Sequence, residues 1–213
     1  HGFGTRRVPQ ESGYYEVYNQ PNVELVSIID NPIIRITPIG LEMDNRKFEF
    51  DMIIYATGFD AITGSFDRID FRGLKGEQLK KKWRDSLETY FGTLVEGFPN
   101  MFMVVGPHSA LGNIPRSVEY AVEWVTDLIK YMIDNDYSSA NPTKKGAKEF
   151  TDFVIEAGRG LLSNEVDSWM TGINRNVEGK QKRIVARYSG SAPKFREMAD
   201  AAAVDGYRGI EFG

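Results

Sequence analysis

Residues 51–60, with the sequence DMIIYATGFD, constrain the fold of this chain more than any other stretch. The stretch begins with a continuous apolar and aromatic run and closes with small residues that end in a glycine. Such a run is typical of a strand buried on both faces, so we predict a central strand that ends in a turn. Ligands of open α/β sheets bind beyond the carboxyl ends of strands, where small residues let a cofactor approach the backbone. Thr57 and Gly58 are therefore candidate cofactor-binding residues, and the alternative is an ordinary core strand.

The composition excludes several classes of function. The chain has 213 residues, 41% of them hydrophobic, which is enough for one core or for parts of two domains. A net charge of -4 with scattered Lys and Arg does not indicate a nucleic-acid partner. The chain has no cysteine and two histidines, so thiolate and three-His metal sites are excluded and we expect no metal. With no apolar run of about 20 residues and no signal-peptide pattern, we expect a soluble, cytoplasmic protein without a membrane partner.

The first quarter of the chain predicts a small β-meander. Strand-like runs occupy residues 23–29, 33–37 and 47–50, with a turn at Gly40. The last run leads directly into the predicted central strand.

Two adjacent guanidinium groups, Arg6 and Arg7, lie in a short loop before this meander. Charged pairs on loops are usually solvated surface. Arginine is nevertheless suited to gripping a phosphate with two hydrogen bonds, and a permanent cation stabilises an oxyanion that forms beside it.

A loop and a helix start form the second notable feature. Residues 99–105 predict another buried strand, ended by Gly106 and Pro107, and the loop after it leads to Pro115, which suits the first position of a helix. That helix continues to about Asn135 with an apolar stripe of Ala121, Val122, Val125, Leu128, Ile129 and Met132. The free amide groups of its N-terminus would suit electron-rich groups of a ligand. His108 lies in the loop without a carboxylate partner nearby in sequence, so we expect a hydrogen-bonded structural residue or spacer rather than a catalytic base.

The remaining third alternates helices with short strands. Thr143 is the expected N-cap of a second helix that extends to about residue 162. Trp169 lies in a mixed aromatic and polar loop, where it either packs in the core or covers a cofactor face with its indole N–H free to bond a ribose or phosphate oxygen. We also expect a strand at 184–188, a helix at 194–204 and a final strand at 207–212.

Several of these stretches together resemble one family. They are the Arg-Arg pair before Gly-Tyr-Tyr, the Ala-Thr-Gly-Phe-Asp pentad at 56–60, the Phe-Pro-Asn-Met-Phe run at 98–102, the Gly-Pro pair with the later Asn113, and Asp-Ser-Trp at 167–169. In this order they resemble Baeyer–Villiger monooxygenases, which are class B flavin-dependent monooxygenases, over essentially the whole chain. The chain looks like the carboxyl-terminal portion of a protein more than twice as long.

The resemblance implies an α/β fold: the carboxyl-terminal portion of a flavoprotein with two dinucleotide-binding, Rossmann-like domains for FAD and NADP. Residues 1–50 would be the end of the NADP-binding domain. Residues 51–213 would be the end of the FAD-binding domain with a terminal extension. The partner implied is the missing amino-terminal portion of the same enzyme, because the glycine loops for FAD and NADP are not found in this chain.

The resemblance also implies the reaction and the roles of individual residues. FAD, NADPH and O2 would form a C4a-peroxyflavin that inserts oxygen into a ketone to give an ester or lactone. Arg7 matches the catalytic arginine that stabilises the anionic peroxide, and Arg6 matches the basic residue at the NADP 2'-phosphate. Trp169 matches the tryptophan that contacts the nicotinamide nucleotide. The cofactor-binding set also includes Asn113 and Ile114, the latter through its backbone at the flavin.

The residues Ser109, Ala110 and Leu111 would line the substrate pocket, and their loop looks most like members that act on large cyclic or steroid ketones. The chain departs from the family after the tryptophan, so the conformation of residues 172–180 is left open. Two alternatives stay open as well. One is a flavin-containing monooxygenase that hydroxylates nitrogen or sulfur, and the other is a non-catalytic fragment of such a flavoprotein.

Overall fold

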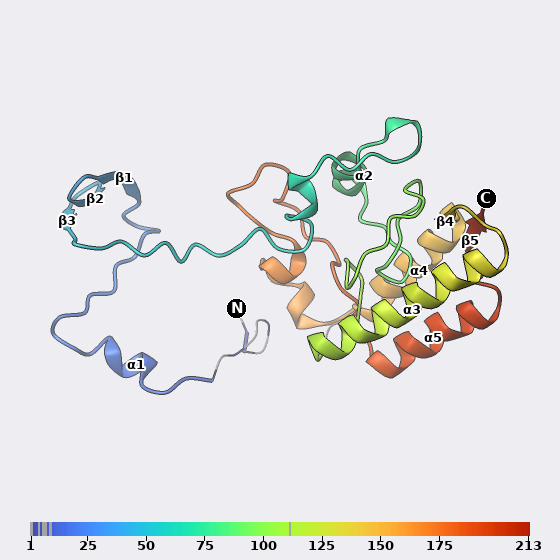
Figure 1. The fold of residues 1–213 in the computed structure, drawn as a ribbon. Coiled ribbons are helices and arrows are strands. Elements are labelled where there is room, and N and C mark those ends of the chain that lie inside the picture. The colour runs from blue at the N-terminus through green and yellow to red at the C-terminus, as the bar shows by residue number, and fades with distance from the viewer. Residues whose placement is uncertain (1, 4, 6–7, 9, 111) are drawn as a thin grey trace. The chain divides into compact units, whose positions relative to one another are not determined.

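The chain divides into two compact units, Val8–Gly58 and a larger unit of His1–Arg7 with Phe59–Gly213. A computed structural model describes residues 2, 3, 5, 8, 10–110 and 112–213, and Figure 1 follows them by colour along the chain. Each unit is described by itself. The assignment of residues 1–50 and 51–213 to the NADP and FAD domains stays a prediction.

The smaller unit contains a three-stranded antiparallel sheet in the order β1-β2-β3. Of the three strands predicted for the β-meander, those at 33–37 and 47–50 are confirmed. Gly40 starts the middle strand opposite Thr37, and a side chain there would place a Cβ 1.9 Å from the Phe48 carbonyl oxygen, so the close pairing of the strands requires glycine. The elements of this unit are α1 (Tyr14–Val17), β1 (Ile33–Thr37), β2 (Gly40–Met43) and β3 (Lys47–Glu49).

The predicted central strand is wrong for this structure. Residues 51–58 form no strand, and Met52, Ile54 and Tyr55 are 76%, 80% and 69% exposed. A strand exists only when a neighbour completes its ladder of hydrogen bonds, and none of the described strands pairs with this segment. The apolar pattern therefore indicates that this segment is suited to burial, but it does not identify the strand that would pair with it.

Three further strand predictions are wrong for the same reason. Residues 23–29, 99–105 and 184–188 have no strand in the structure. The second of these is nevertheless fixed, since the Met103 N–H donates to the Thr93 carbonyl at 2.7 Å. The third makes an isolated parallel bridge between Tyr188 and Ala110.

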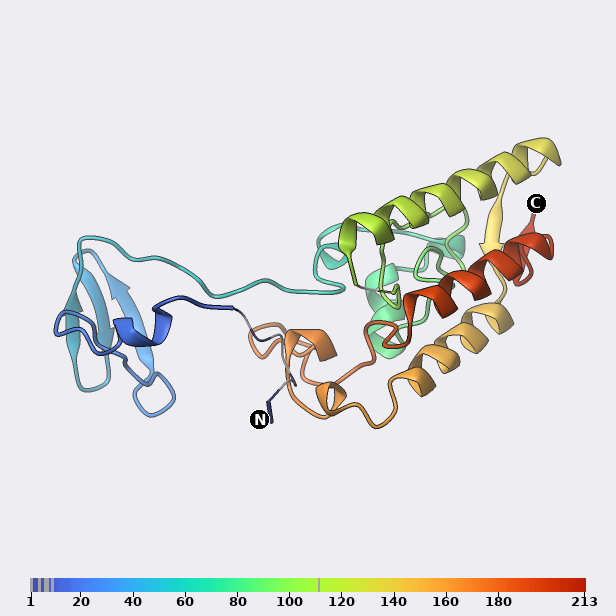
Figure 2. The same cartoon turned by 90° about the horizontal axis from the view of Figure 1, so that it is seen from below.

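The larger unit is built on three helices, α3 (Ile114–Asp134), α4 (Lys144–Ala157) and α5 (Ala192–Val204). Figures 1 and 2 show α5 running beside α3. The antiparallel pair β4 (Ala140–Pro142) and β5 (Ile210–Phe212) joins the segment before α4 to the end of the chain, which confirms the final strand. The short elements are η1 (Phe66–Arg68), η2 (Leu74–Gly76), α2 (Leu79–Asp85), η3 (Leu162–Asn164) and η4 (Trp169–Thr171).

The helix starts confirm the local sequence signals. The Asn113 side chain accepts a hydrogen bond from the Arg116 N–H, and Thr143 accepts one from the Gly146 N–H. Each N-cap satisfies an amide group that the helix leaves without a partner. The helix α3 begins one residue before Pro115, whose fixed φ suits the first turn.

The buried face of α3 differs from the predicted stripe. Trp124, Leu128 and Met132 are its buried residues, four positions apart, and they share one side of the helix. The predicted stripe left out Trp124, whose indole Nε1–H donates to the Ala199 carbonyl of α5 at 3.1 Å. Among the residues described, no helix is both long enough and apolar enough to cross a bilayer.

His108 is a buried structural residue, as expected. Its side chain is enclosed, with Nδ1 3.2 Å from the Thr89 Oγ1 and Nε2 2.9 Å from the Val185 carbonyl oxygen. The His108 N–H also donates to the Ala186 carbonyl at 3.0 Å. Burial lowers the pKa of His108 from 6.5 to about 4, because the charged ring would lose its hydration.

This pKa predicts a dependence of stability on pH. Between about pH 6.5 and about pH 4 the unfolded chain binds a proton on His108 that the folded chain does not, so stability falls as the pH falls through this window. The contribution is on the order of 3 kcal/mol across it. His108→Asn should remove this part of the slope when thermal unfolding is followed from about pH 7 to about pH 4. Parallel curves for parent and variant would contradict a neutral, buried ring.

Candidate functional site

The candidate site is built around the loop that leads into α3. The backbone holds this loop from two directions: Gly106 N–H donates to the Gly92 carbonyl at 3.0 Å, and Tyr188 N–H donates to the Ser109 carbonyl at 3.3 Å. The Ser117 Oγ–H donates to the Ala110 carbonyl at 3.0 Å, which ties the loop to the first turn of the helix. The loop is thus fixed by its neighbours rather than by its own sequence.

The N-terminus of α3 offers a free amide beside this loop. Asn113 uses its side chain as the N-cap, and its carbonyl accepts from the Ser117 N–H at 3.0 Å. Pro115 has no N–H to offer. Within the part of the chain that the structure describes, no acceptor faces the N–H of Ile114, and the Ile114 side chain is half exposed. A carbonyl or other electron-rich group can therefore bind this amide, with the helix dipole in support.

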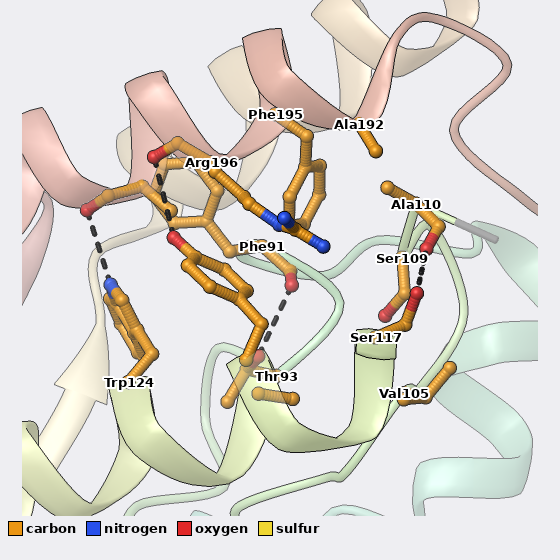
Figure 3. A pocket seen from close by; sticks show the side chains of 13 residues that line it. Phe91, Thr93, Val105, Ser109, Ala110, Ser117, Trp124, Ala192, Phe195 and Arg196 are labelled. Atoms are coloured by element: carbon orange, nitrogen blue, oxygen red, sulfur yellow. Dashed lines mark hydrogen bonds between the residues drawn. The ribbon is translucent and has the colours of Figure 1, made fainter. Parts of the chain in front are cut away.

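Ser109 and Ala110 face a small cavity between α3 and α5 (Figure 3). In Figure 3 the Arg196 side chain extends from α5 toward Ser109, and its guanidinium lies beside the Phe195 ring. The volume of this cavity is about 20 Å³, which has room for about one water molecule. It is too small for a ketone, and the substrate-pocket role of Ser109 and Ala110 stays a prediction.

Trp169 begins the short helix η4 and is half exposed, so one face of its indole is open to a ligand. The helix is held from within: Thr171 Oγ1 accepts from the Ser168 N–H at 3.1 Å and donates to the Val166 carbonyl at 3.0 Å. Beside it, hydrogen bonds from Arg183 and Arg175 lower the pKa of Asp167 and keep it ionised. Trp169 is therefore presented at the surface by a well-supported turn.

Residues 172–180, whose conformation the sequence left open, form a closed loop. The Asn174 N–H donates to the Lys180 carbonyl at 2.9 Å. The Lys180 ammonium lies 2.7 Å from an oxygen of Asp60 and 2.9 Å from one of Asp67. The sequence analysis did not predict the contacts of Lys180 with Asp60 and Asp67. Lys180 lies more than a hundred positions from these two residues in the chain, and no local sequence pattern indicates that they pair.

The structure separates the predicted site residues into three sets. Asn113, Ile114, Ser109, Ala110 and Trp169 belong to the larger unit. The pair at 57–58 belongs to the smaller unit, where Gly58 has a φ of 82° that suits glycine. The residues Arg6, Arg7 and Leu111 lie outside the described residues.

Comparison with known proteins gives relatives over nearly the whole chain, although no protein-family model matches it. The chain is 38% identical over 213 residues to 2-oxo-Δ3-4,5,5-trimethylcyclopentenylacetyl-CoA monooxygenase of Pseudomonas putida, covering 99% of this chain and 39% of the relative. It is 37% identical over 202 residues to cyclohexanone 1,2-monooxygenase of an Acinetobacter species, covering 94% and 37%. Phenazine N-monooxygenase PhzNO1 of Lysobacter antibioticus is 38% identical over 192 residues, covering 88% and 35%. The chain thus spans less than two fifths of the length of these relatives.

Solved structures agree. The crystal structure of OTEMO in complex with FAD and NADP has a TM-score of 0.90 at 36% identity, covering 100% of this chain and 39% of that one. The closed structure of cyclohexanone monooxygenase has a TM-score of 0.92 at 38% identity, covering 100% and 40%. The expected fold class, a portion of an α/β flavoprotein, is confirmed.

These likenesses define the class first: the chain has the fold of a portion of FAD- and NADP-binding monooxygenases. More narrowly, it is homologous to the carboxyl-terminal portion of Baeyer–Villiger monooxygenases, as the sequence indicated.

The N-cap at the candidate site makes a stability prediction. Asn113→Ala should lower the free energy of unfolding by about 1 kcal/mol, because the Arg116 N–H loses its acceptor, while Asn113→Ser should retain most of the cap. Thr143→Ala is the matched control on α4, where the same kind of cap is lost away from the candidate site. Chemical denaturation measures all three. Loss of FAD from Asn113→Ala at unchanged stability would make Asn113 a cofactor ligand instead of a cap.

Proposed function

We propose that this chain is the carboxyl-terminal part of an FAD- and NADPH-dependent monooxygenase that converts a ketone to an ester or lactone. The observation that carries the proposal is its identity of 37–38% with relatives named as ketone-oxidising and related monooxygenases, along almost its entire length. The balanced reaction consumes a ketone, O2, NADPH and a proton, and gives the ester or lactone, NADP+ and water. A cyclic ketone is the substrate class we favour, since both cyclohexanone and cyclopentanone monooxygenases are among the relatives.

FAD fits the start of α3. The open N–H of Ile114 can donate to a carbonyl of the flavin ring, and the capped helix end keeps that amide in place. Asn113 is thereby a positioning residue as well as a candidate ligand. Thr57 and Gly58 would let the cofactor approach the backbone of the smaller unit. When bound, FAD supplies the redox chemistry that activates dioxygen.

NADPH fits two further groups. The half-exposed indole of Trp169 can cover the nicotinamide nucleotide and donate its N–H to a ribose or phosphate oxygen. Arg6 can bind the 2'-phosphate with two parallel hydrogen bonds. One aromatic face and one guanidinium would thus hold opposite ends of the same molecule.

Arg7 is the proposed catalytic residue. Its guanidinium would lie beside the reacting oxygen and stabilise negative charge that develops on it and on the attacked carbonyl. Because an arginine stays protonated at every physiological pH, it holds this charge without giving up a proton. The substrate would lie near Ser109, Ala110 and Leu111.

The exposed apolar run at 52–59 supports the proposal that another protein segment packs against it. Its large side chains have no cover within the described residues, and such surfaces mark contacts with other protein segments. We propose that the amino-terminal portion of the same enzyme supplies strands that pair with this run. A chain without cysteine also suits the reducing cytoplasm, where we place the enzyme.

Oxygenation of an aromatic nitrogen is the second candidate function, favoured by the identity with phenazine N-monooxygenase. It uses the same cofactors, and the two differ in the product: a ketone substrate yields an ester or lactone, whereas a nitrogen heterocycle yields an N-oxide. Mass spectrometry of the products from both kinds of substrate separates them.

Removal of the Arg7 charge tests the proposed role directly. In the complete enzyme, Arg7→Ala should leave FAD bound and reducible by NADPH but lower ester formation by about a hundredfold or more, with hydrogen peroxide formed in its place. Arg7→Lys should recover little, because an ammonium lacks the planar pair of donors. Stopped-flow absorbance and product analysis follow both half-reactions.

Arg35→Ala is the control for this experiment. Arg35 lies in β1 of the smaller unit and pairs with Glu42 of β2 on the surface of the sheet, where an ion pair contributes little. It should leave ester formation unchanged. Ester formation by Arg7→Ala within about threefold of the parent would remove Arg7 from the mechanism.

Trp169 makes a separate prediction. Trp169→Ala should raise the KM for NADPH by about tenfold with little loss of thermal stability, because its exposed indole packs little in the core. Trp124→Ala, at a buried position of α3, should instead cost about 3–5 kcal/mol of stability. A large fall in the melting temperature of Trp169→Ala at unchanged NADPH affinity would make Trp169 a packing residue.

A further inference from the structure

Three charged side chains in the larger unit form an enclosed ion cluster. The Lys180 ammonium lies between Asp60 and Asp67, with contacts of 2.7 Å and 2.9 Å to their carboxylate oxygens. The side chains are only 13%, 17% and 16% exposed. Exposed ion pairs contribute little, but a cluster shielded from water is strong when intact and costly when one member is removed. This cluster is therefore a rigid contact between distant parts of the chain.

Two glycines let the backbone assemble the cluster. Gly64 packs on Asp60 so closely that a Cβ there would lie 2.0 Å from the Asp60 carbonyl oxygen and 2.6 Å from its carboxyl carbon. Gly179 has a φ of 83°, the left-handed region, directly before Lys180. The chain turns at both places and thereby directs the charged groups toward each other.

The cluster closes the loop that follows Trp169. Besides its backbone bond to Lys180, Asn174 donates its Nδ2–H to an Asp60 carboxylate oxygen at 3.3 Å. The Ile173 N–H donates to the Ser168 carbonyl at 3.1 Å, next to Trp169. A continuous set of hydrogen bonds therefore runs from the turn that presents Trp169 to the Lys180 ammonium.

We propose that Lys180 is a positioning residue for the nicotinamide nucleotide: by pairing with Asp60 and Asp67 it holds residues 168–180 so that Trp169 meets that ligand. This rests on the proposed function for the role of Trp169. Without Lys180 the loop loses its ionic contacts with Asp60 and Asp67, and the two carboxylates face each other with no cation between them, so the loop is no longer held against Asp60. The change displaces Trp169 without altering the residues proposed to bind FAD. It therefore weakens binding of the nicotinamide nucleotide and leaves the flavin site intact.

The test is Lys180→Met in the complete enzyme, with Lys182→Met as matched control. Lys182 is exposed two residues later and makes no ion pair with any described residue. We expect Lys180→Met to raise the Kd for NADP+ and the KM for NADPH by about tenfold, with kcat at saturating NADPH within about threefold and FAD affinity unchanged. Trypsin should cleave at Arg175 faster in this variant. Lys182→Met should behave as the parent.

A second pair of variants keeps the test decisive. Lys180→Arg preserves the charge and should recover most of the NADP+ affinity. If Lys180→Met does not fold, Asp67→Asn, which keeps the contact of Lys180 with Asp60, should raise the Kd for NADP+ by about threefold. Unchanged NADP+ affinity and cleavage in Lys180→Met, or equal losses of FAD and NADP+ affinity with a lowered melting temperature, would overturn the proposal. NADP+ binding is measured without ketone, so a parent that forms no ester would refute the proposed function and leave this readout valid.

Discussion

The packing of Phe91 is the contact on which the larger unit depends. Its ring lies 6.0 Å from Trp124 of α3, 4.7 Å from Phe150 of α4 and 6.0 Å from Phe195 of α5, so one side chain contacts an aromatic ring on each of the three helices. Phe91 does this with a φ of 49°, a conformation that bulky residues avoid at a cost of about 1–3 kcal/mol. Replacement of a buried phenylalanine by alanine costs about 3–5 kcal/mol, so the packing of this ring offsets that strain.

Residues 184–188, which form no helix or strand, connect this core to the candidate site. Residues 184–188 accept a hydrogen bond from the His108 N–H at Ala186 and donate one from the Ile184 N–H to the Thr171 carbonyl. The loop before α3 and the turn that carries Trp169 are therefore bound to the same stretch of backbone. A buried, neutral His108 suits this role, since it offers hydrogen bonds without a charge that would need hydration.

The sequence predicted what depends on neighbours a few residues away. Thr143 as an N-cap and Pro115 in a first turn are local signals, and both are confirmed. The strand at 52–55 failed because strand formation depends on a partner that the pattern does not name. Trp124 was left out of the stripe although it shares a face with Leu128, and the Lys180 cluster depends on contacts across the chain. The family resemblance was carried by short stretches such as residues 56–60, and the comparisons support it.

The most direct measurement is the fate of dioxygen in the complete enzyme. With NADPH, a cyclic ketone and oxygen-18 gas, the proposed function predicts a lactone that carries one oxygen-18 atom in its ring, with one NADPH consumed for each lactone formed. A product without the label, or an enzyme that oxygenates a phenazine nitrogen and forms no ester or lactone from cyclic ketones, would contradict it.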